Sequence, residues 1–201
     1  LLMFVHIGAR RLLRKLQDMT LKADSFYFCD SKIDVKIRQA QFRERCGLNV
    51  QQMYGRFVMG SLKLQLPDLC LRTSSSTLQT MVDMDMNAFA DSAPGKLTAM
   101  IRGSIGREDL MLFAGAYMPQ KMRRNWPYYP MEVAGTVKGN MQRLSYSGLK
   151  LNLPSAFQLS SDGWLAHLND MSQMKAKIHL DARTYHLGFV TAMLDPALMK
   201  D

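Results

Sequence analysis

The side chains that usually catalyse reactions or bind metals form no recognisable site in this sequence. The chain has four histidines: His6, His167, His179 and His186. None of them stands in an HxxxH or similar ligand spacing with a carboxylate close by. Asp83 and Asp85 lack the Gly and Glu of a calcium loop, and Ser74–Ser76 is not a G-x-S-x-G elbow. The sequence therefore predicts neither an enzyme nor a metal or cofactor site.

One polar segment, residues 121–130, combines basic and aromatic side chains. Such side chains favour the headgroup region of a membrane, which makes a set of four candidate headgroup contacts: Lys121, Arg123, Arg124 and Trp126. The same combination suits stacking on a single-stranded nucleic acid. A third interpretation is a helix that Trp126 anchors to the end of a sheet, with its basic residues in solvent.

The composition is that of a globular chain, with 47% hydrophobic and 21% charged residues among 201. The net charge of +9 indicates a polyanion partner, an anionic membrane surface or a solvated basic face. The sequence contains no run of 18 apolar residues, so it predicts no membrane-spanning helix. The three cysteines Cys29, Cys46 and Cys70 have no CxxC spacing, which argues against a disulfide framework or a zinc site.

Two similar runs indicate how these side chains are positioned. Leu62-Lys-Leu-Gln-Leu-Pro67 returns as Leu149-Lys-Leu-Asn-Leu-Pro154. Strict alternation of leucine with polar residues is the pattern of a strand with one apolar face. Proline cannot donate to a sheet ladder, so each run is expected to end at its proline.

The same alternation continues through most of the chain from Thr20 onward and predicts about ten or eleven strands. Asp30-Ser31 suits a tight hairpin turn. The apolar parity changes between Leu66 and Leu69, which predicts a bulge near Pro67-Asp68. Short turns between the strands favour a meandering antiparallel sheet.

Helices are expected in only two places. Gly8–Gln17 has the pattern of a short amphipathic helix with a basic face. A helical insertion is expected at about residues 107–125, with Asp109 capping its first turn and Pro119 beginning a second helix, Gln120–Arg124.

So few helical residues cannot cover the apolar face of ten strands. Either the sheet curls until its apolar faces meet in a closed core, or the face stays open and meets lipid. The residues expected to line such a lipid groove share an apolar side chain on one predicted strand face: Phe26, Phe28, Ile33, Val35, Ile37, Leu62, Leu64, Leu66, Val82, Met84, Val133, Val137, Leu149, Leu151, Leu153, Phe157, Leu159, Ile178 and Leu180.

The order of several motifs resembles the AsmA-like TamB proteins of Bacteroidetes-type bacteria. The resemblance extends over roughly residues 20–194. Its motifs follow in this order: Gly47-Leu48, Leu69-Cys-Leu-Arg-Thr73 with Ser75-Ser76, Met84-Asp-Met-Asn-Ala-Phe89, Ser104-Ile-Gly106 with Asp109-Leu110, Trp126-Pro-Tyr-Tyr-Pro130, Gly135-x-Val137-x-Gly139-Asn140 and Leu151-Asn-Leu-Pro-Ser-Ala-Phe157. The resemblance implies an all-β fold: an elongated, twisted, largely antiparallel sheet curled into a U-shaped groove, with one or two short helices.

The resemblance also implies a role. TamB-like proteins are periplasmic bridges, anchored in the inner membrane and reaching a BamA-like barrel partner in the outer membrane. They conduct phospholipids between the membranes or assist outer-membrane protein assembly. The expected partners are therefore phospholipid acyl chains and, through regions outside this sequence, the barrel; no cofactor and no nucleic acid are expected.

The expected organisation is an internal fragment of such a bridge. Residues 1–19 form a short amphipathic helix at a cut edge, residues 20–194 the groove with its insertion, and residues 195–201 the other edge. Two alternatives remain open: a closed β-sandwich spacer without lipid, and a basic polyanion-binding module, which a steep salt dependence of binding would support.

Overall fold

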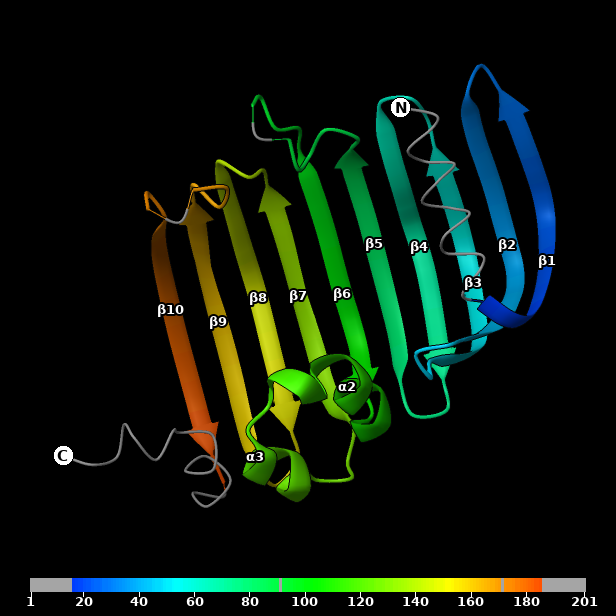
Figure 1. The fold of residues 1–201 in the computed structure, drawn as a ribbon. Helices are drawn as coiled ribbons and strands as arrows, with labels where there is room; N and C mark the ends of the chain where they lie inside the picture. Colours follow the sequence, from blue (N-terminus) through cyan, green and yellow to red (C-terminus); the bar gives the residue numbers. More distant parts are fainter. Residues whose placement is uncertain (1–15, 91, 171, 186–201) are drawn as a thin grey trace.

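A computed structural model describes residues 16–90, 92–170 and 172–185 of the chain. They form a single sheet in which every strand pairs with its neighbour in sequence (Figure 1). The strands are β1 (Leu16–Cys29), β2 (Lys32–Glu44), β3 (Asn49–Met59), β4 (Lys63–Thr73), β5 (Thr77–Asp85), β6 (Leu97–Ile105), β7 (Met131–Gly139), β8 (Arg143–Leu153), β9 (Phe157–Ala166) and β10 (Lys175–Thr184).

All nine strand pairs are antiparallel. In the described part of the chain β1 pairs only with β2 and β10 only with β9, so the sheet is open and forms one layer. The predicted fold class is confirmed: an all-β chain with one antiparallel sheet that does not close, as a curled groove requires, and only short helices. The predicted alternative of a closed sandwich differs from this architecture, because a second packed sheet is missing from the described residues.

The turns follow the predicted chemistry in part. Asp30 and Ser31 have φ values of 47° and 64°, which is the conformation of a two-residue type I′ hairpin, and Cys29 pairs with Lys32 across it. The expected N-terminal helix is wrong for its last residues, because β1 begins at Leu16. Residues 1–15 of that predicted helix lie outside the described residues.

The predicted bulge in β4 is confirmed. Leu66 pairs with Val82 and Leu69 with Thr80, so three steps along β4 match two along β5. Pro67 therefore lies inside the strand and does not end it, because a bulge position needs no ladder donor. Only the second run ends as expected, with Leu153 the last residue of β8 before Pro154.

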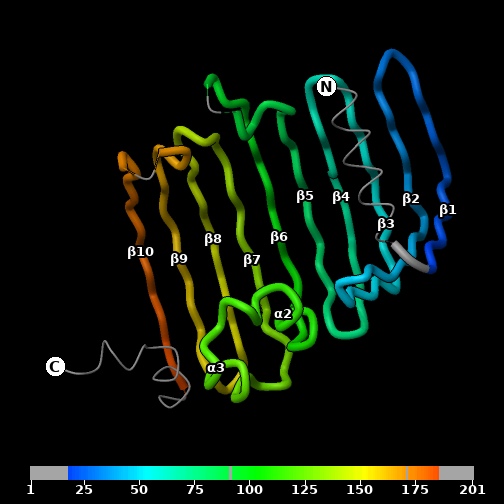
Figure 2. Tube along the Cα trace, viewed as in Figure 1, coloured from blue at the N-terminus to red at the C-terminus, as the bar shows by residue number. Residues whose placement is uncertain are grey.

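Three short helices lie between β6 and β7, and we call residues 106–130 the β6–β7 insertion. They are α2 (Arg107–Ala114), the 3₁₀ helix η1 (Gly115–Tyr117) and α3 (Gln120–Asn125). Figure 2 shows them against one end of β6–β9. Pro119 is the residue preceding α3, close to the predicted start.

Asp109 does not cap α2, contrary to the prediction, because the N-cap residue is Gly106. Its Oδ2 instead accepts hydrogen bonds from three hydroxyls of the β4–β5 turn: Thr73 Oγ1 at 2.5 Å, Ser75 Oγ at 2.9 Å and Ser76 Oγ at 2.5 Å. Ser76 Oγ also accepts the Gly106 N–H at 2.9 Å. Thr73 and Ser76 are buried, so this carboxylate ties the start of α2 to the sheet.

Replacing Asp109 with alanine is expected to lower the free energy of unfolding by about 1–3 kcal/mol, because two buried hydroxyls lose their acceptor. Chemical denaturation followed by circular dichroism measures the loss. Glu108→Ala is the control, since Glu108 is exposed on the same helical turn and such changes stay within about 0.5 kcal/mol. Equal midpoints for the two variants would show that the cluster does not hold the helix.

The main core lies between the insertion and the sheet. Met122 and Trp126 pack there with four buried residues of the sheet and its turn: Met131, Val133, Leu153 and Ala156. Leu153 is fully buried and Trp126 is 4% exposed. The insertion therefore covers one end of the sheet face on which Val133 and Leu153 lie.

Candidate functional site

The pairing register assembles one continuous apolar face. Residues opposite each other in an antiparallel pair point to the same side of the sheet. Followed from β1 to β10, one line of such partners contains no polar side chain: Leu21, Ala40, Met53, Leu71, Leu78, Gly103, Val133, Leu151, Leu159 and Ala182. We call this line the first row.

A second row runs parallel to the first, nearer the other end of the strands. It also crosses all ten strands without a polar side chain: Phe28, Ile33, Met59, Leu64, Met84, Leu97, Gly139, Leu144, Leu165 and Ala176. Ten strands about 4.8 Å apart give each row a length of about 43 Å. The apolar face is the side of the sheet on which both rows lie.

Most of the apolar face has no covering element in the described chain. The insertion lies over the ends of β6–β9 (Figure 1). It buries Val133 of the first row there. Away from it, Ile101 in the middle of the sheet is 39% exposed, and near the edge strands Phe28 is 64% and Leu180 is 62% exposed. A contiguous exposed apolar surface on this scale is typical of an interaction site.

The hydroxyls that lie between the two rows make their hydrogen bonds within the sheet. Thr80 Oγ1 donates to the Met100 carbonyl at 3.0 Å. Ser161 Oγ donates to the His179 carbonyl at 2.8 Å and lies 3.0 Å from the Tyr146 hydroxyl. These hydroxyls already have hydrogen-bond partners, so a ligand on the face does not need to supply them.

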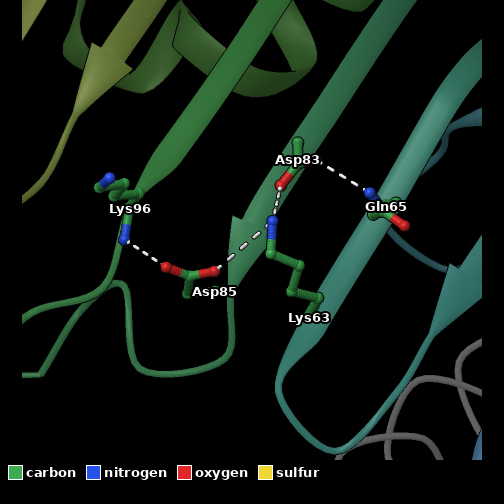
Figure 3. Close-up of polar contacts among 5 residues, drawn as sticks. All are labelled: Lys63, Gln65, Asp83, Asp85 and Lys96. Carbon is green, nitrogen blue, oxygen red and sulfur yellow. Dashed lines mark hydrogen bonds and ion pairs between the residues drawn. The ribbon is translucent and has the colours of Figure 1, made fainter.

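The opposite face is polar and carries cross-strand ion pairs. In Figure 3, Lys63 Nζ lies 3.1 Å from Asp83 Oδ1 and 3.9 Å from Asp85 Oδ1. Hydrogen bonds from Gln65, and then from Lys63, hold the pKa of Asp83 below its usual value. Asp83 and Asp85 thus belong to a charged outer surface. The described residues contain no group of three or more His, Cys, Asp or Glu side chains that could hold a metal ion.

A hollow also lies on the polar face. It has a volume of about 880 Å³ and is lined by charged side chains of both signs: Arg102, Glu132, Lys150, Asp181 and Arg183. These charged side chains do not suit an acyl chain. We therefore take the apolar face, and not this hollow, as the candidate site.

The sequence located much of this face. Every residue of the predicted groove lining lies on the apolar face except Leu62, which stands in the β3–β4 turn before Lys63 begins the strand. Leu62 is 77% exposed there.

The predicted set omitted several members of the face: Leu21, Met53, Phe57, Leu71, Leu78, Leu97, Ile101, Leu144 and Leu165. In β3 the alternation of apolar and polar residues is obscured, because Tyr54 and Val58 also place large side chains on the polar side. A register shift between Val50 and Gln52 further breaks the alternation. In β4 the bulge expected near Pro67-Asp68 already places Leu71 on the same face as Leu66.

The structure divides the four candidate headgroup contacts. Trp126 is 4% exposed and packs in the core, so its ring is not presented at a headgroup surface. Burial of the indole stabilises the insertion instead, as in the anchored-helix interpretation. Lys121, Arg123 and Arg124 are exposed.

Comparison with known proteins gave no matching family model, no similar curated protein and no similar solved structure. Within the described ranges, no helix is both long and apolar enough to cross a bilayer.

Proposed function

We propose that the apolar face binds phospholipid acyl chains and that the chain is a segment of a bridge along which lipids move. The observation that carries the proposal is the pair of apolar rows, which cross all ten strands of an uncovered sheet without a polar side chain. A closed core needs no such continuous open surface.

The transfer free energy of an acyl chain is compatible with binding to the apolar face and with movement along it. Transfer of a methylene group from water to an apolar surface contributes about 0.8 kcal/mol, which is about 12 kcal/mol for a chain of sixteen carbons. A hydrocarbon chain in one leaflet spans about half of the 30 Å bilayer core. Each row, at about 43 Å, is longer than such a chain. An acyl chain could therefore shift across the strands while it stays in contact with similar side chains.

The resemblance to TamB-like proteins supports the cellular part of the proposal. It implies a periplasmic location, an inner-membrane anchor and a BamA-like outer-membrane barrel partner. Assistance in outer-membrane protein assembly is the variant of this role in which unfolded apolar strands, and not lipids, occupy the face. The role is binding and not catalysis in either case.

Phospholipid retained by the purified protein tests the proposal. The protein is expressed in a lipid-containing host and purified in mild detergent, and bound phospholipid is quantified by extraction and mass spectrometry. Leu64→Asp and Val137→Asp place a carboxylate on the apolar face away from the insertion core. A carboxylate in an apolar lipid environment costs about 2.5–3.5 kcal/mol, so retention is expected to fall about 100-fold.

Ala134→Asp is the matched control. Ala134 lies on β7 with Val137 but faces the polar side, where its cross-strand partners are Arg102 and Lys150. This variant is expected to retain lipid like the unmodified chain. Lipid-free unmodified protein, or equal retention by Val137→Asp and Ala134→Asp, would contradict the proposal.

A further inference from the structure

The β6–β7 insertion carries a cluster of exposed aromatic side chains. Phe113 is 60% exposed, Tyr117 90%, Tyr128 85% and Tyr129 60%. None of these rings contributes to the core that holds the insertion on the sheet. Four large rings that lie mostly in solvent within one short segment indicate a surface that meets a partner.

The charges around these rings are mostly positive. The insertion contains four cations, Arg107, Lys121, Arg123 and Arg124, and two acids, Glu108 and Asp109. Asp109 is engaged by the hydroxyls of the β4–β5 turn. None of the four cations forms an ion pair with another described residue; Arg107 instead lies over the Tyr128 ring at 4.8 Å and donates to the Arg123 carbonyl.

We propose that this insertion docks the sheet on an anionic phospholipid bilayer. Tyrosine and phenylalanine rings favour the membrane interface, where the phenol hydroxyl stays in the headgroup region while the ring meets the acyl boundary. Unpaired lysine and arginine side chains complement the anionic headgroups. A protein partner of opposite charge would fit the cations, but it would not explain three exposed tyrosines as well as a headgroup layer does.

The placement of the insertion makes this docking surface useful. It lies against the apolar face at the ends of β6–β9, so a bilayer bound there would be next to one margin of that face (Figure 2). Docking itself does not require the face to carry lipid. The inference therefore stands or fails separately from the proposed function.

Vesicle flotation of the full 201-residue chain tests the proposal. The probes are vesicles of phosphatidylcholine alone and of phosphatidylcholine with phosphatidylglycerol. Flotation with the anionic vesicles only is expected. The triple variant Lys121→Gln, Arg123→Gln, Arg124→Gln is expected to bind about 100-fold more weakly, because each basic residue near an anionic surface contributes about a factor of five. The double variant Tyr117→Ser, Tyr128→Ser is expected to lose binding as well.

Two controls separate this site from general charge and general hydrophobicity. Lys138→Gln, Lys175→Gln, Lys177→Gln removes the same charge from the polar face near the opposite end of the strands. Leu62→Ser, Phe89→Ser removes two exposed apolar side chains from turns at that end, which are 77% and 65% exposed. Both controls are expected to float like the unmodified chain.

The proposal would be overturned if the lysine control lost as much flotation as the insertion triple variant. Absence of binding to anionic vesicles would overturn it as well. Tight binding of a single-stranded oligonucleotide without vesicle binding would also overturn it and identify a polyanion site. Val137→Asp is expected to float normally while it loses retained lipid. This pair of readings distinguishes failure of docking from failure of the groove.

Discussion

Replacing Trp126 with alanine is expected to release the β6–β7 insertion from the sheet while the strands far from it stay paired. Trp126 is 4% exposed and packs with Met122, Met131 and Leu153. Truncation of a buried aromatic side chain costs about 3–5 kcal/mol, because the cavity left behind closes only partly. The three short helices of the insertion have little stability of their own, so this loss is enough to open them.

Hydrogen exchange followed by mass spectrometry measures the effect segment by segment. Amides of residues 106–130 are expected to exchange much faster in Trp126→Ala, whereas those of β2–β4 are expected to be unchanged. Tyr128→Ala is the control, because Tyr128 is 85% exposed and close in sequence. Unchanged protection of the insertion in Trp126→Ala would show that the indole does not anchor it.

Replacing Gly103 with alanine is expected to destabilise the centre of the sheet. Gly103 has a φ of +154°, and an added Cβ would lie 2.0 Å from the Thr77 carbonyl oxygen and 2.9 Å from the Leu78 Cα. Both atoms belong to the backbone of β5, so relief requires movement of a paired strand. Strained backbone alone costs about 1–3 kcal/mol, and the contact adds to that cost.

The midpoint of chemical denaturation measures this change. Gly60→Ala serves as the control, because a Cβ at Gly60 meets nothing within 4 Å and that position needs no left-handed backbone. A midpoint for Gly103→Ala equal to that of Gly60→Ala would mean that β5 and β6 do not approach as closely as described.

The apolar face could be predicted because a sheet pattern is local. Alternation of leucine with polar residues fixes which side chains share a face, and the shift of parity between Leu66 and Leu69 requires one extra residue if both are to stay on it. Leu62 was misplaced because the position of a turn, and not the alternation, decides where β4 begins.

The insertion was harder to predict because its contacts are long-range. Asp109 was expected to cap its own helix, but its hydrogen bonds reach Thr73, Ser75 and Ser76 more than thirty positions earlier, with a separation of 36 for Thr73. No local spacing records such a contact. The choice between a membrane-facing and a core-facing Trp126 likewise depends on which sheet residues lie beneath α3, among them Met131 and Leu153.

Photocrosslinking from adjacent residues of β6 measures whether lipid occupies one face of the sheet. A benzoylphenylalanine replaces Ile101 on the apolar face or Met100 on the polar face, and these positions are 39% and 43% exposed. After irradiation in the presence of phospholipid vesicles, mass spectrometry detects lipid adducts. Adducts are expected at position 101, with few or none at position 100. Equal labelling at both positions, or no adduct at position 101, would show that lipid does not occupy the apolar face.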